Sequence, residues 1–315
     1  MIISMIAWKF SLKRLIRQLW AAGVVGWAVG AVSLVHAAGN DWMAGLPDTT
    51  RLSAVTLPGT HNAGARFEPL TGTAQCQTAT IAEQLGFGIR LLDVRCRHLN
   101  NGFQIYHGPI HQKIDYAEVL RQVLAFLDEN PRECVILSVK EEGQPSGNTR
   151  NFATTFDSYV APNRTRWYLA AKVPVMQEVR GRIVLLRRFG AAGELGLAAT
   201  SWPDNSAFKK DGLIVQDHYQ VKDLAAKWNE IATALNDANT RTETKPIHLN
   251  FTSGYQPGTF GLPNIRAVSN AIHPQLADYF RRAKPGFYGW VIMDFATADL
   301  AELIFRRNLP SGAGK

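Results

Sequence analysis

The stretch Leu57-Pro58-Gly59-Thr60-His61-Asn62 decides how the rest of the chain is interpreted. Residues 52–57 alternate polar and apolar side chains and include β-branched residues, which predicts a strand. Proline and glycine commonly end strands, so we expect this one to end at Pro58 and Gly59. His61 would then lie on a loop just past the carboxyl end of a strand, among small neighbours that leave room for a ligand. By itself, such a histidine fits a general base, a metal ligand or a turn residue.

Further short apolar runs follow, separated by helical patterns or loops. The run 134–139 is almost continuously apolar, as expected of a parallel strand buried on both faces. Eight strands with such crossovers predict a single α/β domain, a TIM-like (β/α) barrel with mainly parallel strands. We expect strands at 52–57, 88–95, 103–106, 134–139, 182–186, 213–216, 247–251 and 290–293. We expect helices at 80–86, 115–129, 152–169, 224–235 and 274–283.

In such a barrel the chemistry lies on the loops after the carboxyl ends of the strands. Two histidines, several acids and several cations of this chain fall at those positions, so their convergence predicts an active site on that rim. The residues are His61, Asp93, Arg95, His107, Lys140, Arg188, Asp217, Tyr219, Asn250 and Asp294.

These side chains suit the cleavage of a phosphodiester without a serine or cysteine nucleophile. Two histidines share the work when one deprotonates a nucleophile and the other protonates the leaving group. Asp294 would fix the tautomer of one imidazole, and the planar guanidinium of an arginine grips two phosphate oxygens. Lys140, Arg188 and Asp217 add polar groups that fit a polyhydroxylated ligand.

Charge and the N-terminal pattern bear on location and partners. The formal net charge is +8, and the four cations of the first 17 residues supply half of it. The remaining excess suits an anionic lipid or phosphate, and no basic stripe interleaved with aromatic residues points to nucleic acid. A basic segment, an apolar run over 19–35 and the small-residue site Val35-His36-Ala37 predict a signal peptide over 1–37. The domain 38–315 would then be secreted or periplasmic; the alternative is an uncleaved membrane anchor.

The three cysteines, Cys76, Cys96 and Cys134, allow one disulfide at most. They contain no C-x-x-C pair, so a structural zinc site is not expected. Cys134 opens an apolar run and is interpreted as a small buried hydrophobic residue.

Ten segments carry a family resemblance, and their order along the chain makes it specific, although none is decisive alone. The segments are 57–61 (LPGTH), 84–95 (QLGFGIRLLDVR), 106–109 (YHGP), 126–131 (FLDENP), 135–140 (VILSVK), 180–188 (RGRIVLLRR), 202–205 (WPDN), 215–219 (VQDHY), 250–253 (NFTS) and 289–294 (GWVIMD). Over residues 52–294 the chain resembles bacterial phosphatidylinositol-specific phospholipase C of the X-domain type.

The resemblance implies a distorted, incompletely closed barrel and a two-step reaction. The inositol 2-hydroxyl attacks the phosphorus, diacylglycerol leaves, and a cyclic inositol phosphate forms that is hydrolysed slowly. The implied partners are phosphatidylinositol or a related inositol lipid and a peripheral membrane surface, with the protein a monomer. By position, the resemblance makes His61 the general base, with Asp294 as its partner, and His107 the general acid. Arg95 would bind the phosphate and be supported by Asp93. The inositol pocket would consist of Lys140, Arg188, Asp217 and Tyr219.

A membrane substrate also implies apolar contacts at the mouth of the barrel. Phe67 and Leu70 after the first strand, and Tyr255 and Phe260 after the seventh, are expected there. Ordinary loop packing is the alternative, because single exposed apolar residues are common.

Asn62 departs from the bacterial pattern, in which an aspartate beside the first histidine assists the general acid. Asparagine keeps the hydrogen bonding but lacks the charge that would raise the pKa of a neighbouring histidine. The eukaryotic relatives carry the same His-Asn pair and use the asparagine to bind calcium. In this chain Arg95 stands where a further acidic ligand would be, and a cation there disfavours Ca²⁺. We therefore expect no metal and no cofactor.

Two other functions remain open on the sequence alone. One is a metal-dependent glycerophosphodiester phosphodiesterase on a similar barrel, which would need a carboxylate cluster near the first histidine. The other is a non-catalytic inositol-lipid-binding module, which Asn62 would favour and the two histidines oppose.

Overall fold

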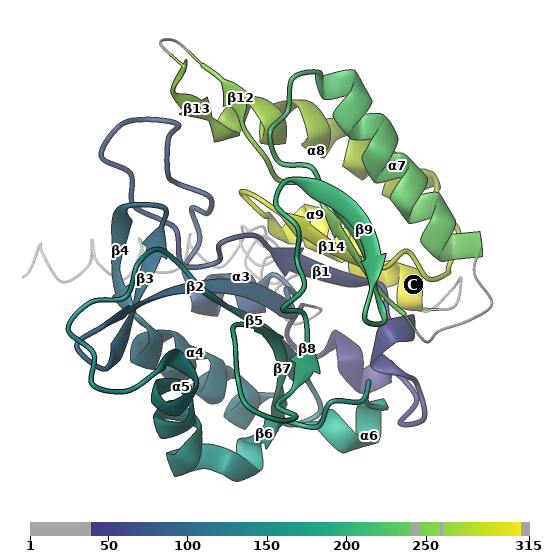
Figure 1. The fold of residues 1–315 in the computed structure, drawn as a ribbon. Coiled ribbons are helices and arrows are strands. Elements are labelled where there is room, and N and C mark those ends of the chain that lie inside the picture. The colour runs from purple at the N-terminus through teal and green to yellow at the C-terminus, as the bar shows by residue number, and fades with distance from the viewer. Residues whose placement is uncertain (1–38, 241–245, 259–260, 310–315) are drawn as a thin grey trace, which may run out of the picture. The chain divides into compact units, whose positions relative to one another are not determined.

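The computed structural model describes residues 39–240, 246–258 and 261–309 (Figure 1). The expected signal peptide and Phe260 lie outside these ranges. A curled sheet of 12 strands carries helices on its outer face, which is the expected TIM-like α/β barrel. Among the described residues, no helix is long and apolar enough to cross a membrane.

The strands occur throughout the chain. They are β1 Leu57–Thr60, β2 Leu91–Leu99, β3 Gly102–His107, β4 Ile110–Asp115, β5 Cys134–Glu141, β6 Trp167–Tyr168, β7 Arg182–Arg188, β8 Leu197–Ala198, β9 Ser206–Lys210, β10 Leu213–Asp217, β11 Ile247–Phe251, β12 Gln256–Pro257, β13 Pro263–Asn264 and β14 Trp290–Met293. The strands β12 and β13 form a separate two-stranded sheet.

The main sheet has the order β6-β7-β5-β2-β1-β14-β11-β10-β9, and its neighbours are parallel except for β10 with β9. One edge of β7 pairs with β6 over its first half and with β8 over its second half. In the described part of the chain no ladder joins this edge to β9, so hydrogen bonding does not close the barrel. The opening agrees with the incompletely closed barrel that the resemblance implied.

Helices pack against the outside of the sheet, and a second apolar core lies inside it. The α-helices are α3 Ile81–Gly86, α4 Tyr116–Glu129, α5 Phe152–Val160, α6 Met176–Val179, α7 Leu224–Thr240, α8 Ile265–Arg282 and α9 Ala298–Phe305. The 3₁₀ helices are η1 Trp42–Gly45, η2 Leu52–Ala54, η3 Ala161–Arg166 and η5 Arg306–Asn308.

Side chains alternate between the two faces of each strand, so the face that contributes to the inner core also contributes to the polar rim. On β2, Leu91 belongs to the inner core, and Asp93 and Arg95 follow at every second position on the same face. The same spacing leads from the buried residues Leu57, Ile136, Leu186, Val215 and Ile292 to His61, Lys140, Arg188, Asp217 and Asp294. Asn250 is out of phase with its inward neighbours Leu249 and Phe251. Its side chain bonds instead to Gln216 and to the carbonyl of Ile231 on α7, so it is not part of the rim.

The prediction for the first strand was wrong in its position. Residues 52–54 form the 3₁₀ helix η2, and Pro58 and Gly59 lie inside β1 rather than ending it. The ladder between β1 and β2 begins at Gly59, so the missing N–H of Pro58 removes no hydrogen bond from that ladder. A Cβ on Gly59 would lie 3.0 Å from that of Leu91, so glycine lets the two strands approach. His61 nevertheless lies just past the carboxyl end of the strand, as predicted.

The strand predicted at 103–106 is not a parallel barrel strand. It is β3, which runs antiparallel to β2 and continues into antiparallel β4. Asn100 and Asn101 join β2 to β3 with φ angles of 50° and 60°, the left-handed pair of a two-residue hairpin. The strand β2 extends beyond the rim, and β3 returns to it and brings back His107.

Some helices differ in length from the prediction. The helix expected over 152–169 ends at Val160 and is followed by η3 and β6. The helix expected at Pro274 begins at Ile265, because the side chain of Asn264 caps it, and Pro274 lies inside it. Helix α9 was not predicted. By contrast, α4 has the predicted start, with Asp115 as its cap, and ends before Asn130.

Candidate active site

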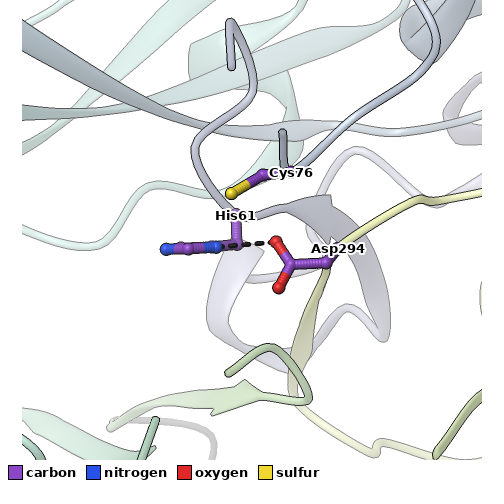
Figure 2. Close-up of side chains that lie close together, drawn as sticks. All are labelled: His61, Cys76 and Asp294. Carbon is purple, nitrogen blue, oxygen red and sulfur yellow. Dashed lines mark hydrogen bonds and ion pairs between the residues drawn. The ribbon is translucent and has the colours of Figure 1, made fainter. Parts of the chain in front are cut away.

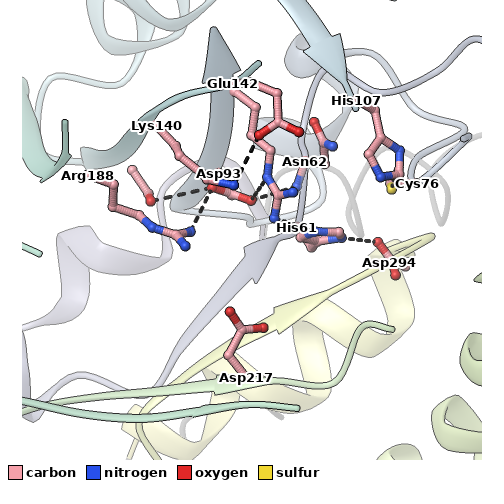
Figure 3. Close-up of polar contacts among 12 residues, drawn as sticks. His61, Asn62, Cys76, Asp93, His107, Lys140, Glu142, Arg188, Asp217 and Asp294 are labelled. Atoms are coloured by element: carbon pink, nitrogen blue, oxygen red, sulfur yellow. Dashed lines mark hydrogen bonds and ion pairs between the residues drawn. The ribbon is translucent and has the colours of Figure 1, made fainter. Parts of the chain in front are cut away.

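The carboxyl ends of the barrel strands bring together the predicted polar residues (Figure 3). From the predicted set, the close-up includes His61, Asn62, Asp93, His107, Lys140, Arg188, Asp217 and Asp294. Tyr219 lies at the outer edge of this group of residues. Its hydroxyl donates to Asp204, and the centroid of its ring lies 6.1 Å from that of Tyr255.

His61 is held from both ring nitrogens. Its Nδ1 lies 2.7 Å from Oδ1 of Asp294, and its Nε2 lies 2.7 Å from Nη2 of Arg95. A guanidinium only donates, so Nε2 accepts and the proton is on Nδ1, facing the carboxylate. This is the tautomer that a general base needs, with the lone pair of Nε2 directed into the site.

Asp93 is a fully buried carboxylate surrounded by donors. Its Oδ2 accepts from Nε of Arg95 and from the backbone N–H of Asn62, both at 3.1 Å, and its Oδ1 lies 3.4 Å from Nη1 of Arg188. Burial alone would raise the pKa of Asp93, but the guanidinium groups of Arg95 and Arg188 hold that pKa well below its usual range. Asp93 is therefore a permanent anion that orients two arginines.

His107 faces His61 from the end of the β3 strand. The two rings are nearly perpendicular, with centroids 6.3 Å apart. Nδ1 of His107 lies 2.7 Å from the carbonyl oxygen of Ala74 and donates to it, which leaves Nε2 as the exchangeable position. Burial and the Arg95 guanidinium lower the pKa of His107 to about 4, although the bond to Ala74 acts in the opposite direction.

Glu142 is a rim residue that the sequence analysis missed. It accepts from Nζ of Lys140 at 3.0 Å and from the backbone N–H of Gly108 at 3.0 Å. Burial would raise its pKa, but Arg95 and Lys140 lower it, so this carboxylate is also charged. The available signal was the alternation along β5, since Glu142 follows Lys140 by two positions.

Trp202 is a second residue that the predicted site lacked. Its Nε1–H donates to Oδ2 of Asp217 at 3.0 Å, and the guanidinium of Arg188 lies over its ring, 3.8 Å from the centroid. The indole thus contacts both the acid and the cation and helps to fix their positions.

Asn62 adopts a left-handed backbone conformation, with a φ of 43°, which asparagine tolerates better than most residues. Its side chain is fully buried, and neither its amide nitrogen nor its amide oxygen has a hydrogen-bond partner among the described residues. The bond from its backbone to Asp93 therefore accounts for its position, and its side chain is left as an unpaired polar group in the site.

Comparison with known proteins gives the family. The profile described as phosphatidylinositol-specific phospholipase C, X domain, matches residues 61–189. The 1-phosphatidylinositol phosphodiesterase of Listeria monocytogenes is 28% identical over 285 residues, which cover 85% of each chain. That of Staphylococcus aureus strain Newman is 26% identical over 82% of this chain and 88% of its own. This chain is similar to X-domain phospholipases C, and residues 61–189 match their shared domain.

Solved structures of this phospholipase family agree with the fold. A Staphylococcus aureus phosphatidylinositol-specific phospholipase C superposes with a TM-score of 0.78 at 23% identity, covering 85% of this chain and 98% of the other. The Listeria monocytogenes enzyme gives 0.66 at 25% identity, covering 86% and 98%. The X-domain match includes the residues from His61 to Arg188, whereas Asp217, Tyr219 and Asp294 follow it in the second half of the barrel.

Proposed function

We propose that this protein is a phosphatidylinositol-specific phospholipase C that forms diacylglycerol and a cyclic inositol phosphate by general acid–base catalysis without a metal. The observation that carries the proposal is the hydrogen-bonded series Asp294, His61, Arg95, Asp93, with His107 opposite His61. It supplies a base, an anion-binding cation and an acid around a space open to one phosphodiester.

The chemical step follows from this arrangement. Nε2 of His61 takes the proton of the inositol 2-hydroxyl, and that oxygen forms a bond to phosphorus. Arg95 turns from His61 to the phosphate oxygens and stabilises their charge. The bond from phosphorus to the glycerol oxygen breaks, and His107 gives that oxygen a proton from Nε2.

The low pKa of His107 is compatible with an acid role because the substrate carries charge. In the site without a ligand, Arg95 and burial favour the neutral ring. A phosphodiester anion next to the ring neutralises Arg95 and favours the protonated form. Substrate binding therefore creates the acid that the leaving group needs.

The group of polar side chains on the other side of Arg95 suits the inositol ring. Lys140, Glu142, Arg188 and Asp217 supply both donors and acceptors, and a polyol needs both at each hydroxyl. We assign Tyr219 to the edge of this group, where the face of its ring can cover the sugar.

We also propose contact with the membrane, but through residues that differ in part from those predicted from the sequence. Leu70 and Leu262 are the large apolar side chains most exposed among the described residues, at 53% and 43%. The ring of Phe67 is covered by the ammonium group of Lys113, 3.5 Å from its centroid, and Tyr255 packs against a small core of Ala65, Cys76 and Ile265. Phe260 lies outside the described residues. We therefore propose Leu70 and Leu262 as the lipid contacts.

We also propose, from the N-terminal pattern alone, that residues 1–37 direct export and that the domain 38–315 works as a secreted or periplasmic monomer.

The test is turnover of phosphatidylinositol in detergent micelles, with phosphatidylcholine and glycerophosphoinositol compared, each with and without EDTA. We expect cleavage of the inositol lipid that persists in EDTA. Loss of activity in EDTA and its return with Ca²⁺ would contradict the metal-free mechanism. Preference for the deacylated glycerophosphodiester would favour the glycerophosphodiester phosphodiesterase alternative, and binding without turnover would favour the lipid-binding module.

A further inference from the structure

The thiol of Cys76 lies beside both histidines, and the proposed reaction gives it no role. Its backbone is fixed by hydrogen bonds to Ala65 and Phe295, and its side chain is fully buried. Its Sγ is 3.6 Å from Nδ1 of His107. All three cysteines are free, and the other two are structural thiols that pack in the apolar cores. Cys134, for example, packs against Met43 in the inner core.

Cys76 belongs to a cluster of possible metal ligands. One ligand atom each from His61, Cys76 and Asp294 lies within 4.8 Å of the other two (Figure 2). In a tetrahedral zinc site, bond lengths of about 2.0–2.3 Å place the ligand atoms roughly 3.3–3.8 Å apart. Nδ1 of His61 and Oδ1 of Asp294 are 2.7 Å apart and need to separate slightly, whereas the thiol sulfur needs to approach by at most about 1 Å to bind the same ion.

We propose that His61, Cys76 and Asp294 form an inhibitory site for a thiophilic divalent cation such as Zn²⁺. The ligand set of thiolate, imidazole and carboxylate suits zinc, whereas Ca²⁺ and Mg²⁺ prefer oxygen ligands only. Two anionic ligands balance the charge of the ion despite the neighbouring Arg95. Three protein ligands leave a fourth position for water.

Metal binding there removes the catalytic base. The ion takes the place of the proton on Nδ1 of His61, and a neutral imidazole bound through Nδ1 carries its proton on Nε2. Nε2 then has no lone pair for the inositol hydroxyl and no longer accepts from Arg95. Asp294 exchanges its bond to His61 for a bond to the ion, and Cys76 loses its thiol proton to solvent.

The cluster is reached from the mouth of the barrel. Cys76 is fully buried, and the side chain of Asp294 is 1% exposed, but that of His61 is 13% exposed. His107 is also partly exposed on the opposite side of the site. An ion therefore arrives along the path used by the substrate, and substrate competes with it.

Cobalt absorption tests the binding without depending on the proposed function. The full chain, freed of metal with EDTA and desalted, is titrated with Co²⁺, and we expect a thiolate-to-cobalt charge-transfer band that Zn²⁺ abolishes. Cys76→Ala and Cys76→Ser should lose the band. Cys134→Ala, which removes a buried thiol at the amino end of β5, should keep it.

Inhibition by Zn²⁺, which does rest on the proposed function, is measured in the micelle assay. Loss of the thiolate should raise the Zn²⁺ concentration for half-inhibition by at least about 100-fold, with turnover retained in Cys76→Ser. No cobalt band in the wild-type protein, or an equal band in Cys76→Ala, would overturn the proposal. So would inhibition that is the same in the Cys76 variants and in Cys134→Ala. A cobalt band in a protein that cleaves no lipid would contradict the proposed function and leave the metal site standing.

Discussion

At the scale of single residues, Arg95 connects the two halves of the chemistry. Through Nε it binds Asp93, and through Nη2 it binds the nitrogen of His61 that we propose as the base. In the resting site the base is therefore occupied, and the substrate phosphate has to draw Arg95 away before His61 is free. The planar fork of arginine makes these two contacts at once, and the single ammonium of lysine does not.

Arg95→Lys should consequently lower kcat/KM by about 10²–10³, the scale of losing one group that stabilises transition-state charge. The fold should be preserved, because a cation still faces Asp93. Steady-state kinetics on micellar phosphatidylinositol measure the effect, and Arg97→Lys, a partly exposed position further along β2, is the matched control. A loss below threefold would remove Arg95 from phosphate binding.

Asn62→Asp should move the basic limb of the pH–rate profile to higher pH. The proposed reaction requires His107 in its protonated form, so activity should fall as pH rises through the pKa of His107 in the complex. Burial and Arg95 lower that pKa to about 4 in the ligand-free wild-type site, and a carboxylate at position 62 would oppose both effects. The pH profile of kcat reports groups in the complex, so comparing it for the two proteins decides the matter. Superimposable basic limbs would show that residue 62 is not coupled to the acid.

At the scale of the elements, the antiparallel β2–β3 hairpin positions His107, the proposed acid. It depends on Asn100 and Asn101, both with positive φ. A β-branched residue in a left-handed conformation costs roughly 1–2 kcal/mol. Asn100→Val should therefore lower the free energy of unfolding by about that amount, and turnover should fall with it because His107 loses its position. Asn100→Gly fits the turn and should retain activity, as measured by denaturant unfolding and kinetics. Equal behaviour of the two variants would contradict the assignment of the turn.

The same elements explain which parts of the architecture the sequence predicts. Runs such as Val135 to Val139 are buried on both faces, and the polar residues that follow them mark the rim, so the barrel and most of the site were predictable. The hairpin signal Asn100-Asn101-Gly102 is local and was overlooked, and β3 was consequently counted as a barrel strand. Glu142 follows Lys140 by two positions, so the alternation of β5 could have assigned it and was overlooked. Trp202 could not be assigned, because its contact with Arg188 depends on tertiary packing.

At the scale of the whole molecule, the proposed function requires the mouth of the barrel to meet a lipid surface. Leu70→Ser combined with Leu262→Ser should weaken binding to phosphatidylinositol-containing vesicles, because two apolar side chains no longer leave water. Cleavage of a soluble inositol phosphodiester should be unchanged, since neither residue contributes to the site described above. Vesicle sedimentation and the soluble assay separate these effects, and equal losses in both would indicate loop packing instead of membrane contact.

The measurement that tests the central claim most directly is ³¹P NMR of the phosphatidylinositol reaction in EDTA, followed from the first turnover. We predict that the cyclic inositol phosphate appears first. We also predict that His61→Ala and His107→Ala each slow its appearance by about two to four decades. An open-chain inositol phosphate as the first product, or near-normal rates in both variants, would contradict the proposed mechanism.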